Sequence, residues 1–264
     1  MRSVASRRGA VRVDRNKTMD EKEVPMRPLI NVIVTSTLGA ACSASSTGAD
    51  TPTTPHGAGH AHGHPQHAHG AGGADHAFTD ADAWSKVFDD PARDAWQRPD
   101  DVVRALALEP GMTVADVGAG TGYFAVRLAR SVPRGEVIAI DVEPDMVRFL
   151  DERARREQLP NLRARLATPT DAGLAASSVD RILVVHVWHH LADRDAYARG
   201  LAAALRPGSK LFIVDFSLIG DRGPPANLRV APETVIAVLE GAGLSARVAP
   251  TALPDQYLVE AQRP

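Results

Sequence analysis

The stretch Val114-Ala-Asp-Val-Gly-Ala-Gly-Thr-Gly-Tyr-Phe124 decides the fold of this chain. A short apolar run ends at Asp116-Val117, glycines follow at positions 118, 120 and 122, and an amphipathic segment begins at Tyr123. This order predicts a strand, a tight turn and the start of a helix. Glycine suits such a turn because it adopts positive φ without a steric penalty and lets a ligand lie against bare backbone. Amides at the start of the helix would face that ligand and favour negative charge.

The spacing of the glycines separates this loop from two other motifs. The dinucleotide fingerprint needs a glycine where this chain has Tyr123, and the P-loop needs a lysine that the loop lacks. The pattern Gly-x-Gly-x-Gly, with Asp116 two residues ahead, instead resembles the first motif of class I S-adenosylmethionine-dependent methyltransferases. Asp141 strengthens the resemblance because it ends the next apolar run, where a carboxylate can accept two hydrogen bonds from a ribose diol. The alternative is a glycine turn in another kind of α/β protein.

The resemblance implies a binding site for the cofactor S-adenosylmethionine. In that site the glycine loop faces the methionine part, Asp116 lies near its ammonium, Asp141 holds the ribose and Val142 touches the adenine edge. The family usually has an acidic residue after the third strand; this chain has Ala167-Thr168-Pro169, so we expect Thr168 or a backbone group there. The residues expected to bind the cofactor are Asp116, Gly118, Ala119, Gly120, Thr121, Gly122, Tyr123, Asp141, Val142, Thr168 and His186.

A histidine-rich segment, His186-Val-Trp-His-His190, follows the fourth expected strand. It resembles the fourth motif of the methyltransferase type 11 group, which includes the ubiquinone/menaquinone-biosynthesis C-methyltransferases and often carries His-His-Leu. The resemblance places His186 beside the cofactor, and His189 and His190 near the mouth of the site. Histidine titrates near neutral pH, so His189 or His190 is a candidate catalytic base for an attacking hydroxyl. The alternative, given equal weight, is that His189 and His190 only cap a helix and pack against their neighbours. No metal site is expected, because neighbouring residues at a strand end point apart.

The rest of the sequence alternates between apolar strands and amphipathic helices. Strands are expected over 112–117, 136–141, 162–167, 181–187 and 210–216, and helices over 122–131, from 143 to a stop at 160, 195–205 and 232–241. A closing strand pair is expected over 244–248 and 256–261. Five strand–helix alternations and a strand pair predict an α/β, Rossmann-like doubly wound sheet of seven strands with a C-terminal antiparallel pair.

Short helices are expected ahead of this sheet. Asp80 or Asp82 is expected to cap the first, and Asp100 to cap another. Class I methyltransferases often carry such leading helices over the cofactor cleft, which makes Arg93, Trp96 and Gln97 candidates for a lid. The alternative is that the aromatic side chains of this region only pack the helices onto the sheet.

Composition narrows the function classes. The 264 residues carry a formal net charge of −2 and only 5% aromatic residues. A nearly balanced charge offers no basic field for nucleic acid, and scarce aromatics argue against a base-stacking surface. We therefore expect a small-molecule partner and no nucleic acid.

The first 42 residues resemble a bacterial lipoprotein signal. An uncharged, mostly apolar run from Leu29 to Ala41 is too short to span a bilayer but has the length of a signal-peptide core. It ends Leu38-Gly-Ala-Ala-Cys42, and Cys42 is the only cysteine of the chain. The resemblance implies membrane attachment through a lipid on Cys42 and a place in the cell envelope. The alternative is a disordered extension of a cytoplasmic protein.

Residues 43–77 are rich in Gly, Ala, Pro, Ser, Thr and His, and include seven of the ten histidines. Such a composition cannot bury enough apolar surface to offset chain entropy, so it predicts a flexible His-rich linker. Loose binding of Zn²⁺, Cu²⁺ or Ni²⁺ by this tail is the alternative to a plain spacer. We thus expect a signal or lipoprotein-like segment over 1–42, a linker over 43–77 and a class I methyltransferase domain over 78–264.

Two functions follow from these observations. The first is an enzyme (EC 2.1.1.-) that transfers a methyl group from S-adenosylmethionine to a small-molecule acceptor. The second is an exported, lipid-anchored protein with a methyltransferase-like fold that is non-catalytic or captures metal through its His-rich tail. The two are in tension because the cofactor is a cytoplasmic metabolite. The near-complete donor site favours the enzyme.

Overall fold

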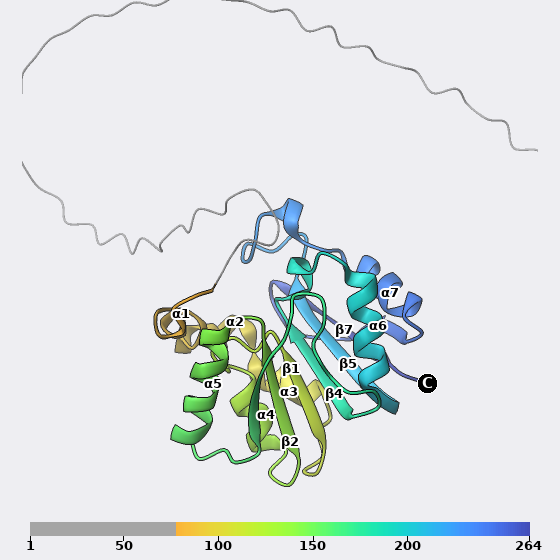
Figure 1. Ribbon diagram of the computed structural model, residues 1–264. Coiled ribbons are helices and arrows are strands. Elements are labelled where there is room, and N and C mark those ends of the chain that lie inside the picture. The colour runs from red at the N-terminus through yellow and green to blue at the C-terminus, as the bar shows by residue number, and fades with distance from the viewer. Residues whose placement is uncertain (1–77) are drawn as a thin grey trace, which may run out of the picture. The chain divides into compact units, whose positions relative to one another are not determined.

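The computed structural model describes residues 78–264, which form a mixed sheet covered by helices on both faces (Figure 1). The described residues form one compact unit. The expected signal segment over 1–42, Cys42 and the His-rich linker over 43–77 lie outside the described residues. Within residues 78–264 no helix combines the length and apolarity needed to cross a bilayer.

The sheet has seven strands, as the sequence predicts, and their order is β3-β2-β1-β4-β5-β7-β6. Strands β1 to β5 run parallel, and β7 pairs antiparallel with both β5 and β6. The strand order reverses between β1 and β4, where ligands of open α/β sheets bind. The strands are β1 Thr113–Val117, β2 Glu136–Asp141, β3 Leu162–Leu166, β4 Val179–Val185, β5 Leu205–Phe216, β6 Ser245–Val248 and β7 Gln256–Gln262.

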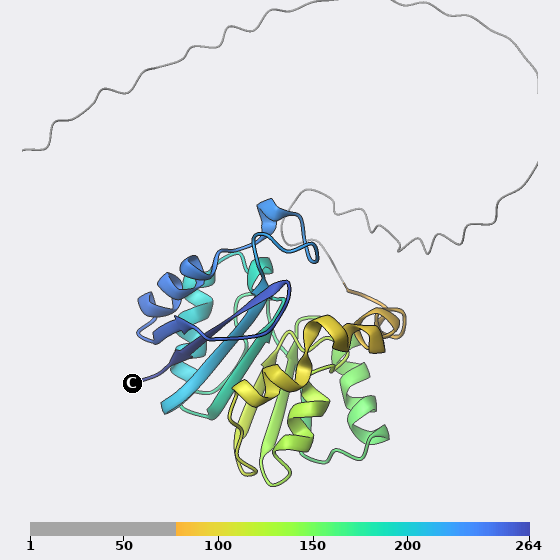
Figure 2. The ribbon, with the colours of Figure 1, turned by 180° about the vertical axis from the view of Figure 1, so that it is seen from behind.

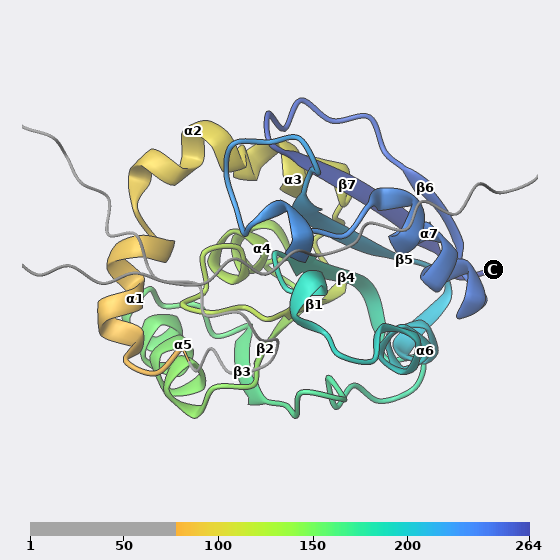
Figure 3. The same ribbon diagram turned by 90° about the horizontal axis from the view of Figure 1, so that it is seen from above.

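Helices cover both faces of the sheet. Seen from above, α3 and α4 lie on one side of the central strands and α6 on the other (Figure 3). The leading helices cross one face, and this arrangement is clearest from behind (Figure 2). The helices are α1 Ala81–Phe88, α2 Asp94–Gln97, α3 Pro99–Ala105, α4 Ala125–Ser131, α5 Pro144–Arg156, α6 Arg194–Ala204 and α7 Pro232–Gly241, with single turns η1 Pro91–Arg93, η2 Trp188–His190 and η3 Ala226–Leu228.

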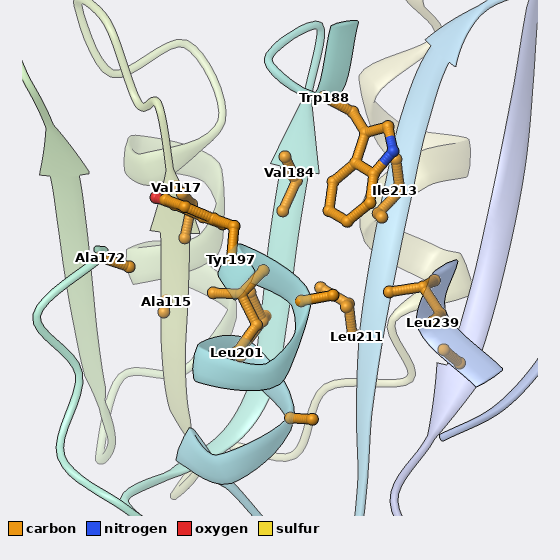
Figure 4. Close-up of a cluster of buried hydrophobic side chains, with 14 of the residues drawn as sticks. Ala115, Val117, Ala172, Val184, Trp188, Tyr197, Leu201, Leu211, Ile213 and Leu239 are labelled. Atoms are coloured by element: carbon orange, nitrogen blue, oxygen red, sulfur yellow. The ribbon is translucent and has the colours of Figure 1, made fainter. Parts of the chain in front are cut away.

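Each face of the sheet has its own core. On the α6 side, Tyr197 and Leu201 pack against Val117 and Val184 of the sheet, and Trp188 lies against Ile213 (Figure 4). On the other face, residues of α3, α4 and α5 pack against the alternate side chains of the same strands. Burying one such large apolar side chain is worth about 1.5–3 kcal/mol, so the two clusters hold the carboxyl edge of the sheet rigid.

The sequence of α5 shows why a helix forms beside β2 and β3. Met146, Phe149, Leu150 and Ala154 are buried, at the spacing of one helical face, and charged residues fill the opposite face. Pro144 stands at the first helical position, where its missing amide costs nothing. The helix ends at Arg156, four residues before the expected stop.

Two boundaries near the carboxyl edge differ from expectation. The helix after the glycine loop begins at Ala125 rather than at residue 122, because residues 120–124 form turns. Strand β4 runs two residues earlier than expected and ends at Val185, because the backbone of His186 adopts φ +57°. His189 and His190 therefore lie in the single turn η2 and not on the strand.

The number of strand–helix alternations was overestimated. Residues 167–178 connect β3 to β4 without a helix, so four helices, not five, alternate with the parallel strands. This segment contains Pro169, which removes an amide donor, and Gly173 at φ +66°, which both disfavour a helix. In the leading region, Asp80 does cap α1, but Asp100 caps nothing, because α3 begins one residue before it at Pro99.

Candidate active site

The glycine loop is tied to the end of β2. Val117 of β1 lies opposite Ile140 of β2, so both strands end at the same edge. The amides of Gly118 and Ala119 donate to the Ile140 carbonyl at 2.8 and 2.9 Å, and the amide of Gly120 donates to Asp141 Oδ2 at 2.8 Å. The loop and the carboxylate that the sequence singles out are therefore in direct contact.

Asp141 is 8% exposed, and both of its oxygens accept backbone hydrogen bonds. Oδ1 accepts from the amide of Glu143 at 3.0 Å, and Oδ2 from that of Gly120. Burial raises the pKa of Asp141, and these amides oppose the rise. Each carboxylate oxygen has a second lone pair for a ligand hydroxyl, so the group can serve a ribose diol.

Asp116 is 3% exposed, and its Oδ2 has no hydrogen-bond partner among the described residues. Burial, and then the charge of Asp141, raise the pKa of Asp116 to about 7. Thr121 Oγ1, in the same loop, is also buried without a partner in this part of the chain. A buried carboxylate without a donor costs free energy that a cationic ligand group would recover. The two orphaned oxygens therefore fit the ammonium end of S-adenosylmethionine.

Gly118 shows why the loop needs glycine. Its φ is +73°, and a Cβ added there would lie 2.2 Å from Val187 Cγ2. Val187 thus packs directly on the bare backbone at the end of β1. The glycine serves both the left-handed turn and the close approach of the segment after β4.

The other residues expected to bind the cofactor differ in how far they are exposed to solvent. Ala119 and Tyr123 are buried, whereas Val142 is 44% exposed. The Tyr123 ring lies between the guanidinium groups of Arg93 and Arg127, with its centroid 4.0 and 4.2 Å from the two carbons. Its hydroxyl bonds to Asp94, and burial raises its pKa.

Thr168 lies in an exposed turn. Its amide donates to the carbonyl of Asp171 at 3.1 Å, and its hydroxyl lies 3.3 Å from that of Thr170. The turn follows β3, two strands from the glycine loop in the sheet.

His186 forms part of an aromatic stack. Its ring centroid lies 4.1 Å from that of Phe216 and 6.0 Å from that of Trp96. Nε2 is buried without a hydrogen-bond partner in the described part of the chain. Burial, followed by the nearby charge of Arg93, lowers the pKa of His186 to about 3, so this imidazole is neutral at physiological pH. The stack joins the leading helices to the ends of β4 and β5.

His189 is held by a carboxylate that the sequence analysis did not single out. Its Nδ1 lies 2.8 Å from Asp215 Oδ1, and the two side chains are 7% and 2% exposed. Asp215 also accepts from the amides of His189 and Phe216, at 3.2 and 2.8 Å. Nδ1 is thereby fixed, and Nε2 makes no hydrogen bond within residues 78–264. Asp215 ends the apolar run from Leu211, as Asp141 ends its own run, and that signal could have found it.

His190 lies beside the pair formed by His189 and Asp215. Its ring centroid is 4.1 Å from that of His189 and 6.3 Å from that of Phe78. No group of three or more His, Cys, Asp or Glu side chains in the described part of the chain is arranged to hold a metal ion.

The leading helices place three expected lid residues at this edge. Trp96 joins the stack with His186, and Gln97 is fully buried, with its Nε2 donating to Gln256 Oε1 at 2.8 Å. Arg93 donates to the Phe88 carbonyl at 2.8 Å and to Gln97 Oε1 at 3.2 Å. Aromatic packing and polar contacts thus both attach this segment to the sheet.

Three features are typical of class I S-adenosylmethionine-dependent methyltransferases. They are the Rossmann-like sheet with its antiparallel C-terminal strands, the glycine loop hydrogen-bonded to Asp141, and the buried Asp116 beside it. Comparison with known proteins agrees. Residues 114–208 match the family described as methyltransferase domain. A crystal structure of an S-adenosylmethionine-dependent methyltransferase from Aquifex aeolicus is 30% identical, with a TM-score of 0.64, covering 69% of this chain and 98% of that one. The chain belongs to the S-adenosylmethionine-dependent methyltransferase family.

Curated relatives are matched over part of their length. An uncharacterized methyltransferase of Mycobacterium tuberculosis is 36% identical over 117 residues, which are 44% of each chain. A ubiquinone/menaquinone biosynthesis C-methyltransferase of Shewanella frigidimarina is 27% identical over 124 residues, 46% of this chain and 49% of that protein. A demethylmenaquinone methyltransferase of Tropheryma whipplei is 32% identical over 122 residues, 46% of this chain and 48% of the relative. The chain thus spans about half the length of these relatives.

Proposed function

We propose that this chain transfers the methyl group of S-adenosylmethionine to a small-molecule acceptor at the carboxyl edge of its sheet. The observation that carries the proposal is the contact between the glycine loop and Asp141, with the unpartnered Oδ2 of Asp116 beside it. Quinone-biosynthesis methyltransferases are among the matched relatives, which supports a small molecule as the acceptor class.

The bound cofactor supplies a methyl group already activated on a sulfonium. The residues of this chain then have two tasks, to align the acceptor behind that methyl group and to keep water away. Alignment of this kind can be worth about 7–11 kcal/mol of the barrier. Asp141 and Asp116 hold the donor from one side, and Trp96, His186 and Phe216 enclose the space near the ends of β4 and β5.

His189 is the group of this site best placed to take a proton. Asp215 fixes Nδ1, so the free Nε2 accepts the proton that the acceptor's attacking atom loses as its bond to the methyl group forms. Asp215 acts as a positioning residue that stabilises the resulting imidazolium, and the acceptor is then a hydroxyl, thiol or amine that still carries its proton.

Calorimetric titration tests the donor site directly. We expect purified protein to bind S-adenosylmethionine and S-adenosylhomocysteine at micromolar concentrations. Asp141→Ala should weaken binding at least a hundredfold, because it removes a charged acceptor for two hydroxyls. Asp151→Asn, at an exposed position of α5, is the matched control and should bind like the wild type. Undiminished binding by Asp141→Ala would refute the proposal.

A second measurement concerns the acceptor. Release of S-adenosylhomocysteine is followed with a panel containing demethylmenaquinone, simple phenols, thiols and primary amines. Turnover with one of these compounds supports the proposal and names the acceptor group. Tight donor binding with no turnover on any member would favour a non-catalytic protein instead.

We propose separately, from the sequence alone, that a lipid on Cys42 attaches the protein to the cell envelope. Globomycin blocks removal of a lipoprotein signal segment, so treated cells should accumulate an uncleaved precursor, and the mature protein of untreated cells should be found in the envelope fraction. If the protein were found only in the cytoplasm of untreated cells, the lipid anchor would be refuted. The enzyme would then lie in the compartment that holds S-adenosylmethionine.

A further inference from the structure

A cavity of about 220 Å³ lies between α6 and the segment that connects β3 to β4. None of the residues expected to bind the methyl donor lines it, so the cavity shares no residue with the donor half of the candidate active site. Its lining residues from α6 are spaced so that they share one face of the helix. The full set is Thr170, Asp171, Ala172 and Leu174 of the connection and Ala196, Tyr197, Gly200 and Leu201 of α6.

Tyr197 brings a hydroxyl without a partner to the wall of this cavity. The residue is 6% exposed, and its hydroxyl makes no hydrogen bond within residues 78–264. Its ring extends from α6 across Val117 of β1 (Figure 4). Burial, and then the nearby charge of Asp171, raise the pKa of Tyr197 to about 12, so the hydroxyl keeps its proton. A buried hydroxyl without a partner costs free energy that a polar ligand group would recover.

Asp171 supplies a negative charge at the edge of the cavity. Its Oδ1 accepts from the amide of Gly173 at 2.8 Å, whereas Oδ2 makes no hydrogen bond in the described part of the chain. No Arg, Lys or His side chain lines the cavity. The guanidinium of Arg165 bonds to the Gly173 carbonyl at 3.0 Å, at an exposed position where solvent and salt screen its charge. The cavity thus combines one uncompensated carboxylate with the apolar walls formed by Leu174 and Leu201.

Gly200 leaves space at the floor of the cavity. It lies inside α6, and a Cβ added there would meet no atom within 4 Å. A glycine in the interior of a helix destabilises it by about 1 kcal/mol relative to alanine, and no close neighbour requires glycine here. Because Gly200 lines the cavity, a side chain at this position would occupy part of it. The missing side chain therefore keeps room for a ligand.

We propose that this cavity binds a small primary ammonium compound with a short apolar chain. An ammonium group has three donors, which suit the free Oδ2 of Asp171 and the hydroxyl oxygen of Tyr197. The apolar chain would then pack against Leu174 and Leu201. The volume lies below the roughly 300–1,000 Å³ of sites for drug-sized ligands, so the ligand is smaller than those. The proposal is independent of the methyl donor and of the proposed function.

Three probes of equal length and different charge test the proposal: n-butylammonium, n-butanol and butyrate. Each is titrated into the protein while the amide signals of Gly173 and Gly200 are followed by nuclear magnetic resonance. We expect n-butylammonium to shift these signals saturably, with a dissociation constant of about 1 mM. The loss of the charge-assisted contacts should make n-butanol bind roughly tenfold more weakly, and butyrate should not bind. Asp171→Asn should reduce the affinity for n-butylammonium to that for n-butanol.

Gly200→Leu should abolish binding of all three probes, because its side chain fills the cavity while leucine favours the helix. Gly241→Leu is the matched control, since Gly241 ends α7 with equally open surroundings and does not line the cavity. Its affinities should equal those of the wild type. Saturation with S-adenosylhomocysteine should leave the affinity for n-butylammonium unchanged.

Four results would overturn the proposal. They are no saturable binding of n-butylammonium, equal affinities for the three probes, unchanged binding by Gly200→Leu, and displacement of n-butylammonium by S-adenosylhomocysteine. The last result would assign the cavity to the donor site instead. None of the four bears on whether the protein binds S-adenosylmethionine, so the proposed function would stand or fall separately.

Discussion

The two halves of the site are built from different materials. In the donor half, at the ends of β1 and β2, the contacts are made largely by backbone: amides of the glycine loop meet the Ile140 carbonyl and the Asp141 carboxylate. In the proposed acceptor half, at the ends of β4 and β5, side chains meet side chains, as in the stack of Trp96, His186 and Phe216. Backbone contacts require glycine and a fixed spacing, whereas side-chain contacts require neither.

The difference explains how one fold can keep its donor and change its acceptor. A backbone cradle tolerates almost no substitution, because each glycine is bounded by a positive φ or a close neighbour. The acceptor half draws on distant segments, with Gln97 and Gln256 separated by 159 positions in the sequence. Its shape can therefore change through loops and helices without disturbing the cradle.

The largest effect on the free energy of unfolding should come from Asp116, the buried carboxyl group of the donor half. In the donor-free protein, Asp116 keeps its proton to about pH 7, whereas in the unfolded chain it loses it near its ordinary value. The native state thus binds more protons between about pH 4 and pH 7, so its free energy of unfolding falls as the pH rises through this window. Asp116→Asn imitates the protonated acid and should be more stable than the wild type at pH 8, by about 4 kcal/mol for a shift of about three units.

Chemical denaturation of both proteins without donor, at pH 5 and pH 8, checks this prediction. The advantage of Asp116→Asn should fall by more than half at pH 5, because the wild-type acid then holds its proton in the native state. Asp151→Asn, an exposed carboxylate of α5, should show little difference from the wild type at either pH. A difference that does not vary with pH would mean that Asp116 is ionised in the folded protein throughout.

The next largest effect concerns Gly118. An alanine there must adopt φ +73° and place its Cβ 2.2 Å from Val187, which adds a clash to the backbone strain. We expect Gly118→Ala to lower the free energy of unfolding by about 3 kcal/mol. Gly173→Ala isolates the strain, because Gly173 has φ +66° and open space around it, and should cost about 1.5 kcal/mol. Equal losses in denaturant titrations would show that Val187 moves aside freely.

The contrast between the backbone contacts of the donor half and the side-chain contacts of the acceptor half also decides what the sequence could predict. The doubly wound sheet, and the positions of the glycine loop and Asp141 after two successive strands, follow from local patterns: apolar runs, glycine spacing and the carboxylate that ends a strand. They were predictable because each signal lies within a few consecutive residues. The boundaries near His186 were missed because its left-handed φ depends on packing against Phe216, which no local pattern shows.

For the acceptor half, the sequence identified candidate histidines but not the residues that surround them. The histidines at 186, 189 and 190 were candidates, but their different environments arise from Phe216, Asp215 and Phe78, which other elements bring to the edge. Asp215 carried a usable signal as the carboxylate near the end of the fifth apolar run. The pairing itself depends on η2, a single turn whose direction the sequence does not encode locally.

A third prediction addresses the histidine and carboxylate pair of the acceptor half. Asp215→Asn keeps the shape but removes the charge that stabilises an imidazolium, so kcat should fall about a hundredfold, or about 2.7 kcal/mol, once the acceptor panel has supplied a substrate. Donor affinity should not change, because Asp215 lies in the other half. Asp215→Glu should recover part of kcat. Loss of donor binding together with kcat would indicate a structural role only.

The smallest effect should come from a glycine that resembles Gly118 in geometry but lies in the acceptor half. Gly223 has φ +95°, and a Cβ there would lie 2.4 Å from the Phe216 ring. It is exposed, in the loop that Arg229 holds through the carbonyls of Ser217, Gly220 and Pro224. Because an exposed loop can lift away from Phe216, we expect Gly223→Ala to cost only about 1 kcal/mol of stability.

The functional readout of Gly223→Ala should separate the two halves. Displacing the loop alters the packing on Phe216, so KM for the acceptor should rise severalfold while the dissociation constant of S-adenosylhomocysteine stays at the wild-type value. Gly118→Ala should do the reverse, weakening the donor because its own loop is disturbed. If Gly223→Ala lost as much stability as Gly118→Ala, the loop would be as rigid as the cradle, and the acceptor half could not vary independently of the donor half.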